Sequence, residues 1–247
     1  MDYEQIANEA RKKVLEIIWK AGTSHVGSNL SVVDIATVLF GKAKLQDQIV
    51  FSAGWKAACA YWFLSRKGIL KWEDVLKTFP NPPYLGLLEP GPGVKFAGGS
   101  MGIAFSMAVG AARARKALGK KGIIYIILSD GELNCGNVWE SARKVIQEGL
   151  NNVVVLVDQN GFQAMGETKE ILDIQPEEMF SGWDIRKIDG HDFTEIEWVL
   201  RTAIPPTAIF AKTIKGKGVS FMEGDNSWHY RKLDKESYEL ATKELGQ

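Results

Sequence analysis

The stretch GIIYIILSDGELNCGNVWESARKVIQEGLNNVVVLVDQNG, residues 122–161, decides the fold class. It contains two apolar runs, 122–128 and 152–157, separated by a helical pattern over 137–149. Two buried strands joined by a helix form a βαβ unit, in which the strands run parallel. Because the carboxyl ends of parallel strands meet at one edge of a sheet, we expect Asp130 and Asn160 to share a crevice there.

The alternation of strands and helices continues on both sides of this unit. Further strands are expected at 48–52, 183–188 and 207–212, and helices at 4–20, 57–66, 101–118, 193–203 and 234–245. Another helix is expected from about Ser31, with Asp34 as the acid of a capping box. Residues 79–98, rich in Pro and Gly, are expected to form an irregular loop that shapes a site or an interface. The pattern predicts an α/β fold, a doubly wound, mainly parallel sheet with helices on both faces, in a single domain over 1–247.

The composition excludes several classes of protein. Of 247 residues, 45% are hydrophobic, which suits one domain with a full core. Lys plus Arg equals Asp plus Glu at 30 each, so net charge gives no reason to expect nucleic acid or a membrane as partner. No apolar stretch is long enough to span a bilayer, and a cytoplasmic protein is expected. Cys59 and Cys135 lack the spacing of a zinc site or a disulfide framework.

Oxygen-bearing side chains follow both strands of the opening unit. Asp130 comes after the first strand, and Asp158-Gln159-Asn160-Gly161 comes after the second. A carboxylate and a carboxamide suit a hard cation such as Mg²⁺, which commonly shares its ligands with phosphates. Gly131 would allow close backbone approach to a phosphate, and the following helix N-terminus favours negative charge. The residues predict a Mg²⁺-diphosphate site, and the alternative is that both Asp-Gly and Asn-Gly pairs only form turns.

Several segments together resemble one family. SDGEL followed after a helix by DQNGFQ resembles the thiamine diphosphate motif of transketolases. SHVGSNLSVVDIATVLF (24–40), KIDGHD (187–192) and KTIKGKGVSFMEGDNSWH (212–229) are similar to further segments of that family. The resemblance covers almost the whole chain and implies the diphosphate-binding, PP-type domain, with thiamine diphosphate and Mg²⁺ as cofactors (Ca²⁺ or Mn²⁺ as substitutes).

The same resemblance implies a partner. The family's pyrimidine-binding domain, which carries the glutamate that activates the cofactor, has no counterpart in this sequence. We therefore expect the N-terminal subunit of a split transketolase, completed by a C-terminal transketolase-like subunit in an α₂β₂ heterotetramer with a small-molecule substrate. The lone chain is expected to turn nothing over.

Roles follow for residues that match family positions. The resemblance implies that Asp130 and Asn160 hold the metal by their side chains and Phe162 by its backbone carbonyl. Asn160 also contacts the cofactor, and Gly131 approaches its diphosphate.

Four more positions match cofactor-contacting residues of the family. Gly99 and Met101 match positions whose backbones contact the aminopyrimidine ring. His25 and His229 match histidines near the diphosphate, the thiazolium and the reacting carbon, where imidazole can exchange protons with the substrate near neutral pH. For both the alternative is a packing or capping role, and His191 is expected to be structural.

Other residues keep two interpretations. Lys215-Gly216-Lys217-Gly218 fits a phosphate-binding nest or a flexible basic surface loop. Glu140 matches an acidic position at the family's subunit interface, or it is a solvated helix residue. Trp55, Trp183 and Trp228 are expected to be packing residues unless they line the cleft.

The chain also departs from the family pattern. Trp55 stands where the family has an active-site histidine, and a second histidine is missing from the loop at 80–84. Met101-Gly102-Ile103-Ala104 replaces the family's L-G-Q-G, and Cys135 replaces an interface glutamate.

These departures bear on the substrate. We expect transfer of a two-carbon ketol or related acyl unit to an aldehyde-type acceptor with non-standard substrates. The alternatives are an ordinary pentose-phosphate transketolase subunit whose missing histidines the partner supplies, or a non-catalytic regulatory subunit. The E1 component of a 2-oxo acid dehydrogenase would share the diphosphate motif but not the 212–229 segment.

Overall fold

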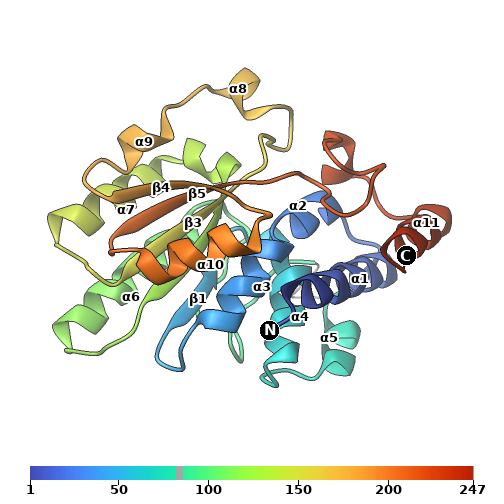
Figure 1. Ribbon diagram of the computed structural model, residues 1–247, viewed down its shortest axis with the longest axis horizontal. Helices are drawn as coiled ribbons and strands as arrows, with labels where there is room; N and C mark the ends of the chain where they lie inside the picture. The colour runs from blue at the N-terminus through green and yellow to red at the C-terminus, as the bar shows by residue number, and fades with distance from the viewer. Residues whose placement is uncertain (82–85, 247) are drawn as a thin grey trace.

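A five-stranded parallel sheet forms the centre of the molecule (Figure 1). The computed structural model describes residues 1–81 and 86–246. The strands are β1 (Gln48–Phe51), β2 (Ile124–Ser129), β3 (Val153–Gln159), β4 (Asp184–Asp189) and β5 (Thr207–Lys212), in the order β1-β2-β3-β5-β4. Strands β2 and β3 are parallel neighbours, with Ser129 opposite Asp158. The predicted βαβ unit is confirmed.

Helices cover both faces of the sheet (Figure 1). They are α1 (Tyr3–Ala21), α2 (Val26–Ser31), α3 (Val33–Lys42), α4 (Ala57–Arg66), α5 (Trp72–Thr78), α6 (Ile103–Ala117), α7 (Gly136–Gln147), α8 (Thr168–Ile171), α9 (Pro176–Met179), α10 (Phe193–Thr202) and α11 (Lys235–Gly246). Helices α6 and α7 pack together over one face, and α3 and α10 pack together over the other. Short 3₁₀ turns η1 (Gly54–Lys56), η2 (Asp130–Asn134) and η3 (Asn226–His229) lie between the larger elements. The doubly wound α/β fold is confirmed.

Alternating side chains of each strand enter two separate cores. In β3, Val153, Val155 and Val157 pack beneath α6 and α7, whereas Val154 and Leu156 belong to the core on the other face. Because both faces are covered, the strand is apolar throughout rather than alternating. The sequence 153–157 therefore reads as one continuous apolar run.

The predicted capping box at Ser31 and Asp34 is wrong. Ser31 ends α2, and α3 begins at Val33 without a side-chain cap. The Ser31 hydroxyl instead donates to Asp158 at 2.6 Å, and Asp34 accepts a 2.6 Å hydrogen bond from Arg11. Both side chains are buried, so partners from distant segments satisfy them better than a solvent-side cap would.

The loop expected over 79–98 is irregular where it is described. It lies against η1, since the Leu88 N–H donates to the Gly54 carbonyl at 2.9 Å. Residues 82–85 fall outside the described part, so most of the segment in which a family histidine is missing has no structural account.

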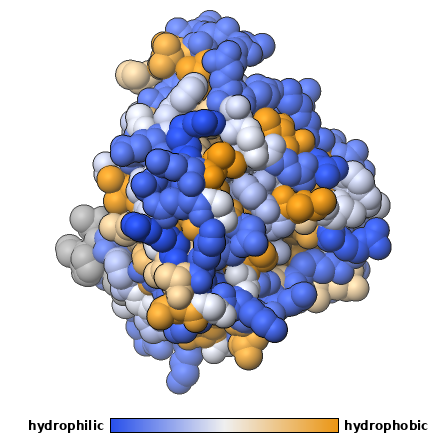
Figure 2. Space-filling model, turned by 90° about the vertical axis from the view of Figure 1, so that its left-hand side faces the viewer, coloured by the Kyte–Doolittle hydropathy of each residue, from blue (hydrophilic) through white to orange (hydrophobic). Residues whose placement is uncertain are grey.

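The surface is mixed in character. Figure 2 shows the face at the left of Figure 1, where apolar patches are separate and surrounded by hydrophilic residues. Among the described residues, no helix is long and apolar enough to cross a membrane.

Candidate active site

A pocket of about 280 Å³ lies beyond the carboxyl ends of β2 and β3. Six of the predicted site residues line it: His25, Met101, Gly131, Asn160, Phe162 and His229. Two do not. Asp130 lines an adjoining hollow of about 380 Å³, and Gly99 is exposed outside both. A larger hollow of about 430 Å³ surrounds Gln46 and Gly122, before the first residues of β1 and β2, and is lined by none of the predicted residues.

The turn that carries Asp130 is held by a buried glutamate. Ser129 and Glu132 form a capping box across η2. The Glu132 carboxylate also accepts hydrogen bonds from the Ser52 hydroxyl at 2.5 Å and the Gly102 N–H at 3.0 Å. One side chain thus ties the ends of β1 and β2 to the start of α6, which fixes where Asp130 and Gly131 lie.

The carboxylate of Asp130 reaches across to the neighbouring strand end. It accepts hydrogen bonds from its neighbour Gly131 N–H at 2.9 Å and from the Gly161 N–H at 2.6 Å. Burial, together with the nearby Asp158 carboxylate, raises the pKa of Asp130 to about 7. A cation beside Asp130 would favour its charged form.

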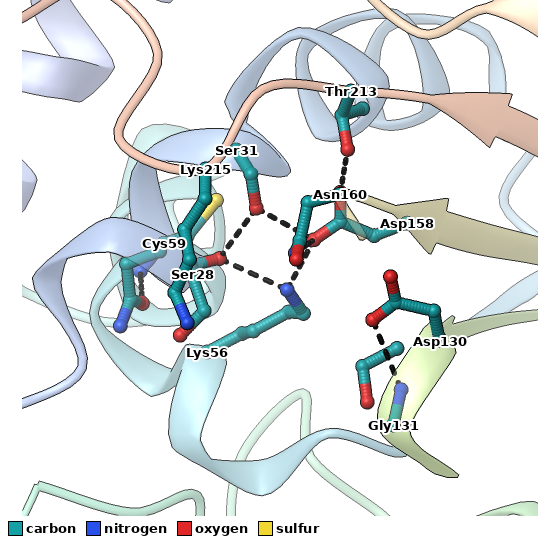
Figure 3. A network of polar contacts seen from close by, with 12 residues as sticks. Ser28, Ser31, Lys56, Cys59, Asp130, Gly131, Asp158, Asn160, Thr213 and Lys215 are labelled. Atoms are coloured by element: carbon teal, nitrogen blue, oxygen red, sulfur yellow. Dashed lines mark hydrogen bonds and ion pairs between the residues drawn. The ribbon is translucent and has the colours of Figure 1, made fainter. Parts of the chain in front are cut away.

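The remaining expected metal ligands are close in sequence to Gly161. Asn160 Oδ1 accepts from the Phe162 N–H at 3.1 Å, and Figure 3 shows Asn160 and Asp130 projecting from adjacent strand ends. The described residues contain no cluster of three His, Cys, Asp or Glu side chains suited to a metal. The expected ligands are instead one carboxylate, one amide oxygen and one backbone carbonyl, which are hard oxygen donors of the kind that fit Mg²⁺.

Asp158 is not free to act as a ligand. It forms a fully buried ion pair with Lys56, and it accepts hydrogen bonds from the Thr213 hydroxyl and, at 3.3 Å, from the Asn160 amide (Figure 3). Burial alone would raise the pKa of Asp158, but the Lys56 ammonium together with hydrogen bonds from Ser31 and Thr213 holds that pKa below its ordinary value. Asp158 therefore orients the Asn160 side chain by accepting a hydrogen bond from its amide nitrogen.

The two predicted catalytic histidines are adjacent. The His25 N–H donates to the His229 carbonyl at 2.9 Å, and the ring centroids are 4.7 Å apart. Burial, with Lys215 nearby, lowers the pKa of His25 to about 4 and that of His229 to about 3. Both imidazoles are therefore neutral near neutral pH. The capping alternative for His25 fails, because its side chain makes no cap hydrogen bond.

Backbone strain accompanies this arrangement. His25 has φ 69°, and it is the one non-glycine residue in the left-handed region in the described part of the chain. Such a conformation is unfavourable for a residue with a Cβ, and it persists where the surroundings enforce it. Functional sites are a common place for it.

Lys215 lies inside the pocket rather than on the surface. Its side chain is buried, and its ammonium donates to Asn226 Oδ1 at 2.6 Å and to His229 Nδ1 at 3.2 Å. Burial, reinforced by Lys56, lowers the pKa of Lys215 to about 8. The flexible-loop interpretation is therefore wrong for Lys215. Lys215 forms no ion pair within the described residues, so its ammonium is available to bind an anionic ligand.

The chain is similar to known proteins over almost its whole length. Residues 3–247 match the family model described as "Transketolase, thiamine diphosphate binding domain". The chain belongs to the transketolase family. Its relatives include the 6-deoxy-6-sulfo-D-fructose transketolase subunit SqwG of a Clostridium species, 34% identical over 99% of this chain and 96% of that protein. Another is an apulose-4-phosphate transketolase subunit of Phocaeicola vulgatus, 30% identical over 96% of this chain and 91% of that protein.

A solved transketolase has the same fold. The transketolase from Campylobacter jejuni superposes with a TM-score of 0.91 at 26% identity, over 100% of this chain. This chain spans 43% of the length of that protein.

Within this family, the structure locates the other residues that the sequence singles out. His191 is structural, as expected: its Nδ1 lies 2.7 Å from Asp34, and its Nε2 accepts from the Ile214 N–H at 2.8 Å. Trp183 and Trp228 are buried, whereas Trp55 lines the pocket.

The two positions that were expected at a subunit interface lie on or beside α7. Glu140 is exposed on α7. Cys135 immediately precedes α7, and burial raises the pKa of its thiol, so it is neutral.

Three pocket residues carry little or no signal in the sequence. Lys56 was identifiable only in part, as a lone lysine in an apolar segment. Lys215 was likewise identifiable only in part, as the first lysine of KGKG. Gln163 gives no signal, because a glutamine after a turn has no distinctive spacing.

Proposed function

We propose that this chain is the thiamine diphosphate-binding subunit of a two-subunit transketolase-like enzyme that uses Mg²⁺. The reaction is transfer of a two-carbon ketol unit from a ketose to an aldehyde acceptor. The observation that carries the proposal is the pocket at the ends of β2 and β3. It combines hard oxygen ligands, two neutral histidines and a buried lysine without an ion pair in the described part of the chain.

Each part of the pocket suits one part of the cofactor. Asp130, Asn160 and the Phe162 carbonyl would hold the metal, and Gly131 and Lys215 would bind the diphosphate. Met101, exposed at the pocket, would contact the organic rings. When bound, thiamine diphosphate supplies carbanion-stabilising chemistry that no side chain offers.

His25 and His229 would form hydrogen bonds with substrate oxygens and exchange protons with them. Because the Lys215 ammonium donates to His229 Nδ1, the ring proton of neutral His229 lies on Nε2. His229 can therefore donate a hydrogen bond to a substrate oxygen. His25 has Nδ1 at 2.9 Å from the Ser24 hydroxyl, which leaves Nε2 for a bound molecule. Neutral imidazoles in these positions can donate or accept a hydrogen bond without bringing a charge into the pocket.

The substrate is proposed to differ from those of ordinary transketolases. Trp55 lines the pocket with its ring centroid 6.5 Å from that of His25, and the Tyr230 ring centroid lies 6.0 Å from that of His25. Aromatic side chains favour apolar faces over the sugar hydroxyls that a histidine would bind. The names of two relatives specify a sulfofructose and apulose 4-phosphate, which supports an uncommon ketose donor here.

A complementary subunit completes the proposed enzyme. The relatives named as transketolase subunits are matched over 91% and 96% of their length, whereas this chain spans 43% of the C. jejuni transketolase. The second subunit would supply the pyrimidine site and the activating glutamate, in an assembly with two copies of each chain.

The proposal is tested by purifying the chain alone and together with its complementary subunit. Ketose and aldehyde pairs are then screened with thiamine diphosphate and Mg²⁺. Ketol transfer by the pair and none by the lone chain is expected. Activity of the lone chain would overturn the split-subunit proposal, and cofactor binding by the pair without any transfer would favour a regulatory role.

A further inference from the structure

Gln163 occupies a distinctive place in the pocket. It follows β3 in a short turn in which its N–H donates to the Gly166 carbonyl at 2.8 Å. Gln163 is one of the residues that line the pocket, with Gly131, Asn160 and Lys215. The mixed metal-ligand set does not use it, and the histidine pair does not contact it in the described hydrogen bonds.

The amide nitrogen of Gln163 is buried and has no hydrogen-bond partner in the described part of the chain. The other amide at this strand end is satisfied, because Asn160 Nδ2 donates to Asp158. A buried donor without a partner costs free energy, and native structures retain few of them. Such a donor at a ligand pocket indicates that a ligand supplies the missing acceptor.

The position of the side chain indicates which part of the ligand that is. A Cβ built on Gly131 would lie 3.5 Å from Gln163 Cγ, so the glutamine side chain packs directly beside Gly131. Gly131 is the residue proposed to approach the diphosphate. The Lys215 ammonium lies 5.5 Å from the ring centroid of Phe162, the residue before Gln163 in the chain. Gln163 thus contributes a neutral donor to a region whose positive charge comes from Lys215.

We propose that Gln163 is a cofactor-binding residue whose side-chain amide donates a hydrogen bond to the diphosphate of thiamine diphosphate. This inference rests on the proposed function. Donors to a charged acceptor are the stronger class of hydrogen bond, and this one also removes the penalty of the unpaired buried nitrogen.

The test compares Gln163→Leu with wild type in the complex with the complementary subunit. Isothermal titration in Mg²⁺ measures the affinity for three ligands: thiamine diphosphate, inorganic diphosphate and thiamine. Leucine is apolar, ends one bond short of the glutamine amide nitrogen, and has no donor. The variant is expected to bind both diphosphate compounds about tenfold or more weakly, and thiamine unchanged. The melting temperature of the cofactor-free complex is expected to be equal or higher, since an unsatisfied donor has been removed.

Two further variants serve as a control and as a second test of the role of Gln163. Gln5→Leu, on the exposed side of α1, should bind all three ligands as wild type does. Gln163→Glu keeps the side-chain length and places a negative charge beside the diphosphate, so it should weaken binding more than Gln163→Leu. If Gln163→Leu lowers the melting temperature, Gln163→Glu decides the outcome by the same three titrations.

The outcomes separate this inference from the proposed function. Unchanged diphosphate affinity in the Gln163 variants, with normal wild-type binding, overturns the role of Gln163 alone. Equal weakening of thiamine and diphosphate compounds also overturns it. A wild-type complex that binds none of the three ligands overturns the proposed function itself.

Discussion

The Asp130 carboxylate accepts a 2.6 Å hydrogen bond from the Gly161 N–H, which joins the ends of β2 and β3. This contact holds the expected acidic metal ligand beside the segment that carries Asn160 and Phe162. It is made although Asp130 is buried with its pKa raised to about 7, a condition that a bound cation would relieve.

Replacing Asp130 with Asn should abolish Mg²⁺-dependent cofactor binding while preserving the hydrogen bond to Gly161. The amide keeps an acceptor oxygen but cannot offer the negative charge. We expect thiamine diphosphate affinity to fall by more than about 100-fold, beyond the effect of losing a residue that only orients a metal ligand. Titration calorimetry of the two-subunit complex measures this. Asp74→Asn, exposed on α5, is the matched control, and equal affinities of wild type and Asp130→Asn would contradict the metal assignment.

Lys56→Met should destabilise the fold strongly. The change leaves the Asp158 carboxylate buried at 0% side-chain exposure without its cation, which typically costs about 3–5 kcal/mol. Adding Asp158→Asn removes the unpaired buried charge, so the double variant should recover part of the lost free energy of unfolding. Urea unfolding of wild type, Lys56→Met and the double variant gives the free energies of unfolding.

An exposed pair provides the control for this prediction. Lys42 and Glu197 form an ion pair with side chains 45% and 39% exposed, so Lys42→Met should lower the free energy of unfolding far less than Lys56→Met. If Lys56→Met is no less stable than Lys42→Met, the buried pair contributes little.

The histidine pair should make stability depend on pH. The pKa of His25 falls from an ordinary 6.5 to about 4 on folding, so the unfolded chain binds more protons between these values. The free energy of unfolding should therefore decrease as pH falls through this window. Its slope is at most about 1.4 kcal/mol per pH unit for one histidine, and smaller here because the ring is partly exposed.

His25→Asn isolates that contribution. Asparagine tolerates the left-handed backbone at φ 69° and does not titrate. Its free energy of unfolding should change less steeply with pH than that of wild type. An identical slope in both proteins would show that His25 keeps its ordinary pKa in the fold.

Trp55→His should shift substrate preference. The tryptophan lines the pocket beside His25, and a smaller polar ring would restore a hydrogen-bonding group for sugar hydroxyls. We expect kcat/KM for common ketose phosphates to rise relative to the native donor by about tenfold or more. Trp198→His, at an exposed position on α10, should leave the ratio unchanged. An unchanged ratio in Trp55→His would remove Trp55 from specificity.

The fold was predictable because the central strands are covered on both faces. Val153 to Val157 are all buried, so burial alone produces the continuous apolar run that marks a parallel strand. Prediction from the local sequence pattern failed at Ser31 and Asp34, where a capping box was expected. Their partners, Asp158 and Arg11, are far away in sequence, and local pattern contains no information about such pairs.

The site was predictable where chemistry follows a strand end. Asp130 and Asn160 lie at adjacent strand ends because a parallel sheet brings successive carboxyl ends together, although they line adjoining hollows rather than one crevice. Gln163 was not predictable and Lys56 only in part, since their roles depend on burial and on which atoms lack partners. Gly99 does not line the pocket in the described structure, and its expected contact with the cofactor stays a prediction.

The most direct test of the central claim is a titration of the purified two-subunit complex with thiamine diphosphate, in Mg²⁺ and again after chelation of the metal. Saturable binding is expected in Mg²⁺, and it should be lost without the metal and in Asp130→Asn. Binding that ignores the metal, or no binding at all, would contradict the assignment of this pocket as a metal-diphosphate site.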